Sequence, residues 1–138
     1  MIDVTILRGW VEALGYDATS EGATTLRIRP RPGAHEGEAP SSAPLPPFFL
    51  QLSENWVLLS MLPMLARGAY RPEDLGRRLL AANREMRLAK FALDKNGAVV
   101  LCAELPTESL DASEIADAVQ RMTHYARRFV AEFGQGRG

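Results

Sequence analysis

The sequence has few of the residues that most often carry chemistry. Its 138 residues include two histidines and a single cysteine, Cys102. One cysteine excludes an intramolecular disulfide, which suits a reducing compartment. Zinc sites usually need three or four well-held ligands, and the one short cluster, His35, Glu36 and Glu38, lies in a stretch rich in proline, glycine and alanine. We therefore interpret these three as solvated loop residues and expect no metal.

A strong net charge is also absent. The 16 Lys and Arg residues nearly balance 17 Asp and Glu residues, giving a formal charge of -1 and a pI of about 6.1. No global positive field exists to hold nucleic acid. Arginines such as Arg121, Arg127 and Arg128 are interleaved with acidic residues, which is typical of solvated helix faces. We expect no nucleic-acid partner.

The chain contains no apolar run long enough to cross a bilayer. A membrane-spanning helix needs about 20 mostly apolar residues. The most apolar stretch, residues 46–65, is interrupted by Gln51, Ser53, Glu54 and Asn55. The N-terminus also lacks a basic segment followed by an apolar one, the mark of a secretory signal. We expect a cytoplasmic, soluble protein of one domain, with no membrane partner.

Catalytic motifs are missing as well. The sequence has no phosphate-cradling glycine loop, no nucleophile elbow and no paired His and Cys ligand set. A nucleophilic Cys102 would need a lowered pKa and a nearby base. Its apolar neighbours favour a small buried hydrophobe on a strand instead. The sequence therefore predicts a protein that is not an enzyme and uses no cofactor.

Three helices are expected, at residues 4–14, 71–86 and 111–133. The first and the last begin at an aspartate cap, Asp3 and Asp111, and Glu114, three positions after Asp111, gives the last a pattern close to a capping box. The last helix also carries an apolar stripe at helical spacing, formed by Ile115, Val119, Met122, Ala126, Phe129 and Phe133. Gly134 is expected to end it, leaving residues 134–138 as a flexible tail.

Five strands are expected between these helices. They cover residues 24–30, 48–54 and 55–63, and a hairpin over 87–106 whose turn contains Gly97. We interpret residues 17–23 as a loop. Residues 30–47 hold six of the nine prolines and are expected to form a long loop inserted into a hairpin. The order is α-β-β-β-α-β-β-α, which predicts a single-domain α+β sandwich with an antiparallel sheet over residues 1–138.

The strand at residues 55–63 is apolar on both faces. These faces carry Trp56, Leu58 and Leu62 on one side and Val57, Leu59 and Met61 on the other. A helix layer would cover one face, and Phe49 would join the outward one as a patch for a peptide or a second subunit. The alternative, in which helices or the proline-rich loop cover both faces, stays open.

The stretch from residue 79 to 106, followed by residues 110–129, resembles the YbjN-type bacterial family and, more distantly, the type III secretion chaperones. The shared features are a helix end with Leu79, Leu80 and Asn83, a strand with Lys90 and Phe91, a turn with Asp94 and Gly97, and Leu105 before Pro106. The resemblance extends from about residue 72 to 133 and is topological before that. It implies a chaperone-like fold, commonly a homodimer, that binds other proteins. Asn83 is expected to cap its helix.

The hypothesis that follows is a non-enzymatic, chaperone-like module that binds a protein or peptide. It would hold an apolar segment on the sheet face around Phe49, Trp56 and Leu58, with Trp10 on the first helix contributing. The alternative is a dimeric regulator or scaffold of the YbjN type with no client peptide. The residues expected to form its dimer contact are Leu75, Leu79 and Met86. Two features depart from the secretion chaperones: the nearly neutral charge and the insertion at residues 30–47.

Overall fold

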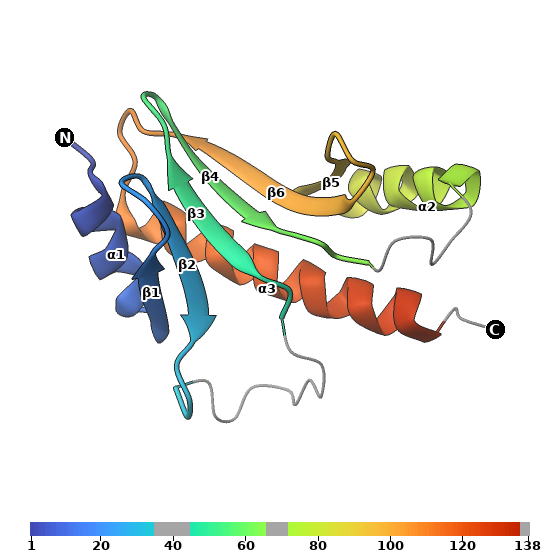
Figure 1. The fold of residues 1–138 in the computed structure, drawn as a ribbon, viewed down its shortest axis with the longest axis horizontal. Coiled ribbons are helices and arrows are strands. Elements are labelled where there is room, and N and C mark those ends of the chain that lie inside the picture. The colour runs from blue at the N-terminus through green and yellow to red at the C-terminus, as the bar shows by residue number, and fades with distance from the viewer. Residues whose placement is uncertain (35–44, 66–71, 136–138) are drawn as a thin grey trace.

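The computed structural model describes residues 1–34, 45–65 and 72–135. Three helices, α1 (Val4–Glu12), α2 (Pro72–Glu85) and α3 (Ala112–Gln135), combine with six strands. The strands are β1 (Tyr16–Ser20), β2 (Thr25–Pro30), β3 (Phe48–Leu52), β4 (Trp56–Met61), β5 (Lys90–Leu93) and β6 (Val99–Pro106). The predicted α+β class is confirmed (Figure 1).

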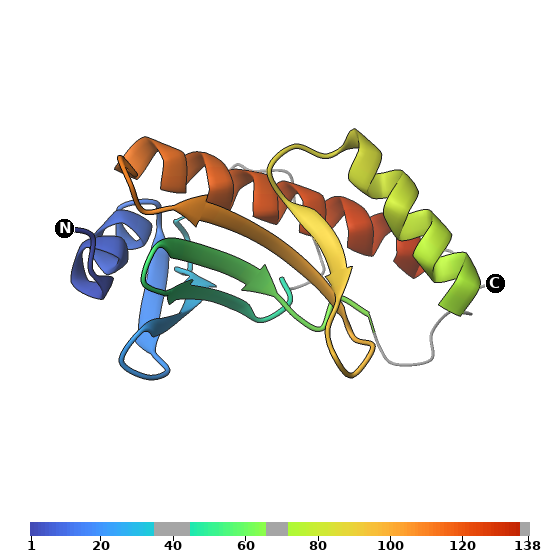
Figure 2. The same cartoon turned by 90° about the horizontal axis from the view of Figure 1, so that it is seen from above.

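All six strands belong to one antiparallel sheet with the order β1-β2-β3-β4-β6-β5. Helix α3 runs along one face of this sheet, with α1 at the β1 end and α2 at the β5 end (Figures 1 and 2). Among the described residues, no helix covers the opposite face. We call the face under α3 the inner face and the opposite one the outer face.

Alternation along the strands separates the two faces, because successive side chains of a strand point to opposite sides. In β4, Val57, Leu59 and Met61 are fully buried on the inner face. Trp56, on the outer face, keeps 47% of its surface exposed. The predicted division of this strand into two apolar faces is therefore confirmed, and helices cover one of them.

The predicted caps of α1 and α3 are confirmed. The Asp3 carboxylate accepts a hydrogen bond of 2.8 Å from the backbone N–H of Ile6. Asp111 accepts from the Ser113 hydroxyl at 2.7 Å and from the Glu114 N–H at 2.9 Å, and these bonds lower the pKa of its carboxyl. All six residues of the predicted α3 stripe are buried. The helix does not end at Gly134, as expected, but continues to Gln135.

The expectation of a loop at residues 17–23 is wrong. Residues Tyr16–Ser20 form β1, which pairs with β2 from Tyr16 opposite Pro30 to Ser20 opposite Leu26. The sheet therefore has six strands and not the five expected. This segment is polar and lacks the alternation of a half-buried strand, so its pairing with β2 decides its conformation.

The loop expected at residues 30–47 does connect two adjacent strands, since β2 and β3 form an antiparallel pair with Ile28 opposite Phe48. Most of that loop, including His35, Glu36 and Glu38, lies outside the described residues. The predicted hairpin of β5 and β6 is confirmed. Its turn contains Gly97, whose φ of 82° lies in the left-handed region that favours glycine.

Asn83 has a different role from the expected helix cap. It lies in the last turns of α2, and its side-chain amide bonds to the backbone of Phe91 on β5. The Asn83 Oδ1 accepts from the Phe91 N–H at 2.7 Å, and its Nδ2 donates to the Phe91 carbonyl at 3.1 Å. The Lys90 Nζ donates to the carbonyls of Asn83 and Met86, both at 2.7 Å, and so caps the end of α2.

Candidate functional site

The outer face of the sheet is the most distinctive surface of the described chain. Its centre consists of Phe49 on β3, Trp56 and Leu58 on β4, and the smaller Ser60 and Cys102 on β4 and β6. The strand register places Phe49 opposite Ser60 and Ser60 opposite Cys102. Phe49, Trp56 and Leu58, which we call the apolar patch, are thus held by adjacent central strands.

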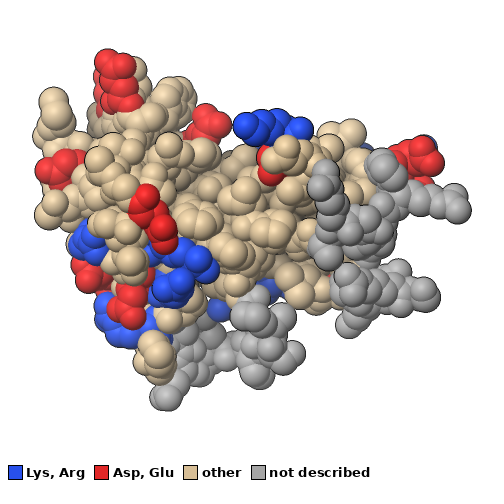
Figure 3. Space-filling view, viewed as in Figure 1, with Lys and Arg blue, Asp and Glu red and all other residues tan. Residues whose placement is uncertain are grey.

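Charged side chains lie on both sides of the apolar patch. Arg27, on β2, lies opposite Phe49 in the register, and its guanidinium carbon stands 5.6 Å from the centre of the Phe49 ring. Glu104, on β6, lies opposite Leu58. In Figure 3, Lys and Arg gather over β1 and β2 with a few acidic residues among them, whereas the surface over β3 and β4 is largely uncharged. The patch is an uncharged band between a basic strand and an acidic position.

Side chains from elsewhere in the chain occupy both edges of the sheet. At the β1 edge, the Arg8 guanidinium donates to the Ala18 carbonyl and, at 2.7 Å, to the Ser20 hydroxyl. At the β5 edge, Asn83 bonds to both backbone groups of Phe91. A partner strand extends a sheet by bonding to free backbone groups of an edge strand, and the groups named here are already bonded. Binding on the outer face therefore fits this molecule better than strand addition.

The predicted binding residues do not all lie together. Phe49, Trp56 and Leu58 share the outer face, as the sequence suggested. Trp10 lies on α1, which contacts β1, β2 and α3, and it is partly buried against the core. The sequence did not point to Arg27 or Glu104, because they are distant in the chain and come together only through the strand register.

Of the predicted dimer residues, Leu79 and Met86 are each 5% exposed and pack in the core of the chain itself. Leu75 is partly buried against the same core. This burial contradicts the expectation that Leu79 and Met86 are available to a second copy. The outward side of α2 instead carries Leu80, which is 72% exposed.

Cys102 lies on the outer face of β6 and is not the fully buried residue that we expected. Its thiol donates a hydrogen bond to the Lys90 carbonyl, with 3.6 Å between sulfur and oxygen. Partial burial, and to a lesser degree the negative charge of Glu104, raise the pKa of the thiol. A raised pKa disfavours the thiolate that a nucleophile or a metal ligand needs.

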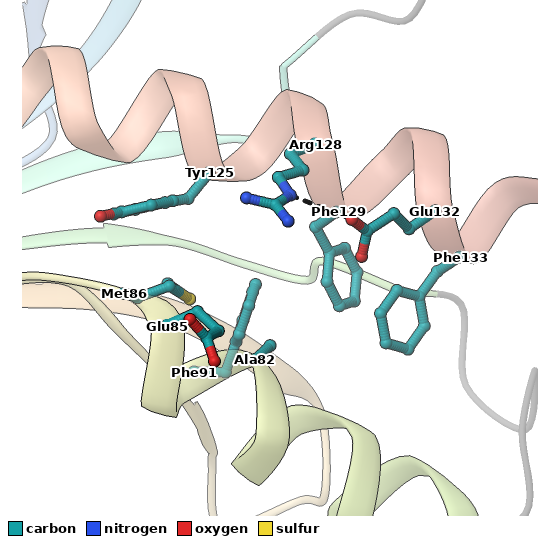
Figure 4. Close-up of a pocket in the computed structure, with 9 residues that line it drawn as sticks. All are labelled: Ala82, Glu85, Met86, Phe91, Tyr125, Arg128, Phe129, Glu132 and Phe133. Atoms are coloured by element: carbon teal, nitrogen blue, oxygen red, sulfur yellow. Dashed lines mark hydrogen bonds and ion pairs between the residues drawn. The ribbon is translucent and has the colours of Figure 1, made fainter.

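A groove lies between α2 and α3 (Figure 4). Its volume is about 70 Å³. One wall of the groove is aromatic and consists of Phe91, Phe129 and Phe133. The ring centre of Phe129 lies 4.7 Å from that of Phe91 and 4.1 Å from that of Phe133. Arg128 and Glu132 form an ion pair of 3.0 Å beside it. Small-molecule sites usually measure about 300–1,000 Å³, so this groove is too small for a cofactor.

Two general features of the described residues bear on function. No group of three or more His, Cys, Asp and Glu side chains in residues 1–34, 45–65 and 72–135 could hold a metal ion. Within the same ranges, none of the helices has the length and apolar character needed to span a membrane.

Comparison with known proteins identifies the family and the fold of this chain. The chain is similar to the crystal structure of YbjN from E. coli, which is described as "a putative transcription regulator". The TM-score is 0.70 at 18% sequence identity, over 97% of this chain and 93% of that one. It is also similar to a chain of the heterodimeric ExoU-SpcU complex from the type III secretion system of Pseudomonas aeruginosa. Here the TM-score is 0.62 at 22% identity, over 91% of this chain and 95% of that one.

These identities are low enough that the two structures establish the fold alone, which this chain shares with YbjN and with a chain of the ExoU-SpcU complex. No curated protein has a significant sequence match to the chain. Residues 48–135 match the YbjN family, described as "Putative bacterial sensory transduction regulator". That match covers more than half of the chain and extends the resemblance suggested by residues 72–133 back to the start of β3. The chain belongs to the YbjN family.

Proposed function

We propose that this protein is a non-enzymatic, chaperone-like binding module of the cytoplasm that holds an apolar segment of a partner protein on its outer sheet face. The observation that carries the proposal is the apolar patch on a face that no described helix covers. Trp56 is 47% exposed there, although Val57, Leu59 and Met61 of the same strand are fully buried. An exposed tryptophan among apolar neighbours is typical of an interface anchor.

Three further features support this proposal. Arg8 and Asn83 already bond to backbone groups of the two edge strands, which favours binding on the outer face over strand addition. The groove between α2 and α3 is too small for a substrate or cofactor. The chain also shares its fold with a chain of a heterodimeric complex.

The proposal is tested by purifying the tagged protein from its own host under gentle conditions and recording native mass spectra. We expect a complex that contains a second protein in a fixed ratio. The variant Trp56→Ala should lose that second protein while it keeps its circular dichroism spectrum. Retention of the second protein by Trp56→Ala would overturn the proposal, because the patch would then not be the binding surface.

The second candidate function is a regulator or scaffold whose homodimer is its functional state, without a client peptide. The observation that favours it is a group of exposed leucines on and around α2 and β5: Leu80 at 72%, Leu93 at 58% and Leu88 at 40%. In this case the native spectra contain a bare dimer. The variant Leu80→Asp should then dissociate the dimer, whereas Trp56→Ala should leave it intact. A bare monomer would count against both candidates.

A further inference from the structure

We propose that the partner segment carries an acidic side chain, which binds Arg27 and Arg29 while neighbouring apolar residues of the segment cover the apolar patch. This inference rests on the proposed function, because it specifies the chemistry of the partner at the same outer face. It is carried by the hydrogen bonds that these arginines lack, by their position beside the patch, and by the distribution of charge across the sheet.

Arg27 is incompletely satisfied in the chain as it stands. Its Nε is buried and has no hydrogen-bond partner, the only such side-chain atom in the part of the chain that the structure describes. The buried Nε is closed to a partner, so a carboxylate would bind the terminal N–H groups of the guanidinium, whose planar fork fits a carboxylate. The fork of Arg27 lies near the Phe49 ring, at 5.6 Å from guanidinium carbon to ring centre, so it is positioned at the margin of the apolar patch.

The four arginines near this corner of the sheet differ in what they do. Arg8 bonds to the Ala18 carbonyl, and Arg31 bonds to Asp17, with 3.2 Å between its Nε and the carboxylate oxygen. These two are therefore engaged inside the chain. Arg27 and Arg29 form no hydrogen bond through their side chains and no ion pair with any described residue. They alternate on β2 and so lie on the same outer face, where they can bind one carboxylate together.

The charge changes sign across the outer face. Glu104 lies on β6, three strand spacings from β2, which corresponds to about 14 Å across the sheet. It forms no ion pair with a described residue. A single-stranded nucleic acid would need a continuous basic track for its phosphates, and a phosphate chain crossing from Arg27 would meet Glu104. An otherwise apolar peptide with its acidic residue at the β2 end avoids this repulsion.

The probe for the test is a phage-displayed library of random dodecamer peptides, selected on the immobilised full-length protein. We expect enriched peptides to combine Asp or Glu with aromatic or aliphatic residues. The best peptide is then synthesised, with a matched analogue in which its acidic residue is replaced by the amide. Affinities are measured by fluorescence polarisation at low and high salt.

The double variant Arg27→Gln with Arg29→Gln should lower the affinity for the acidic peptide by about tenfold and leave the affinity for the amide analogue unchanged. The matched control is Arg77→Gln, which removes the same charge from the exposed surface of α2, away from the patch. This control should bind as the wild type does. Arg29→Gln alone repeats the test at an exposed position and keeps it decisive if replacing Arg27 impairs folding.

The outcomes separate the two proposals. Peptides that need Trp56 but show no acidic preference would overturn this inference and leave the proposed function standing. Failure to enrich any peptide whose binding depends on Trp56 would overturn the proposed function itself. Binding of a mixed-sequence single-stranded DNA that is lost in the double variant would replace the peptide by nucleic acid. A wild-type homodimer that dissociates in the double variant would assign the face to a second copy.

Discussion

Replacing Trp56 by alanine separates an interface residue from a core residue. An aromatic side chain buries about 150–250 Å² when it is fully covered. Because Trp56 keeps 47% of its surface exposed, about half of that area, roughly 100 Å², is removed from water. At about 25 cal/mol per Å² this corresponds to ~2.5 kcal/mol, which is an upper limit because alanine retains some contacts and the unfolded chain is partly compact. We expect Trp56→Ala to lower the free energy of unfolding by about 1–2 kcal/mol.

The matched control is Leu59→Ala, on the same strand but on the inner face. Leu59 is fully buried, and truncating such a leucine usually costs about 2–5 kcal/mol. Urea denaturation followed by far-UV circular dichroism measures both variants without relying on the fluorescence of the tryptophan that is removed. A cost for Trp56→Ala equal to that of Leu59→Ala would refute the reasoning, because Trp56 would then be a core residue. For binding, the expectation is a loss of about 2 kcal/mol or more with Trp56→Ala.

Four further predictions follow from individual contacts. Asn83→Ala removes both the donor to the Phe91 carbonyl and the acceptor for the Phe91 N–H, so we expect a loss of about 1–3 kcal/mol in urea denaturation and faster hydrogen exchange at the Phe91 amide; unchanged exchange would contradict the bridge. Phe129→Ala empties the centre of the aromatic cluster and should cost about 3–5 kcal/mol in the same assay. The lowered pKa of Asp111 stabilises the fold above the ordinary value of 3.8, and this stabilisation is lost as the pH falls through the folded-state pKa; Asp111→Asn should flatten the acid side of the stability curve. The raised pKa of Cys102 predicts slower alkylation by iodoacetamide at neutral pH than for glutathione, and an equal rate would refute it.

Local signals made most of the elements predictable from the sequence. The caps Asp3 and Asp111 act within three residues of their helices, and the hairpin turn needs only the conformational freedom of Gly97. Such features are visible in a short window of sequence. The stripe on α3 is also local, because its spacing follows directly from the helical repeat.

The elements that were missed depend on contacts between distant residues. Strand β1 is polar and without alternation, and it is held by its register with β2 and by the bond from Arg8 to the Ala18 carbonyl. Asn83 bonds to Phe91, eight residues away and in another element. For both, the choice among possible conformations is made by tertiary contacts, which composition and periodicity do not encode.

The candidate site shows the same division between local and distant information. Alternation along β4 was enough to place Trp56 and Leu58 on one face, and it predicted the apolar patch. The polarity of that face was hidden, because Arg27 and Glu104 are far apart in sequence and belong to strands separated by β3 and β4.

A formal charge of -1 correctly describes the weak long-range field of the protein, yet it says nothing about contacts at hydrogen-bond distance. At physiological salt, fields between exposed charges are screened beyond about 8 Å, so net charge governs little of what a bound segment meets. A partly buried arginine with an unsatisfied donor is screened less and acts at contact. Selectivity on this face should therefore depend on contact with Arg27, and changes of net charge elsewhere on the surface should leave it unaltered.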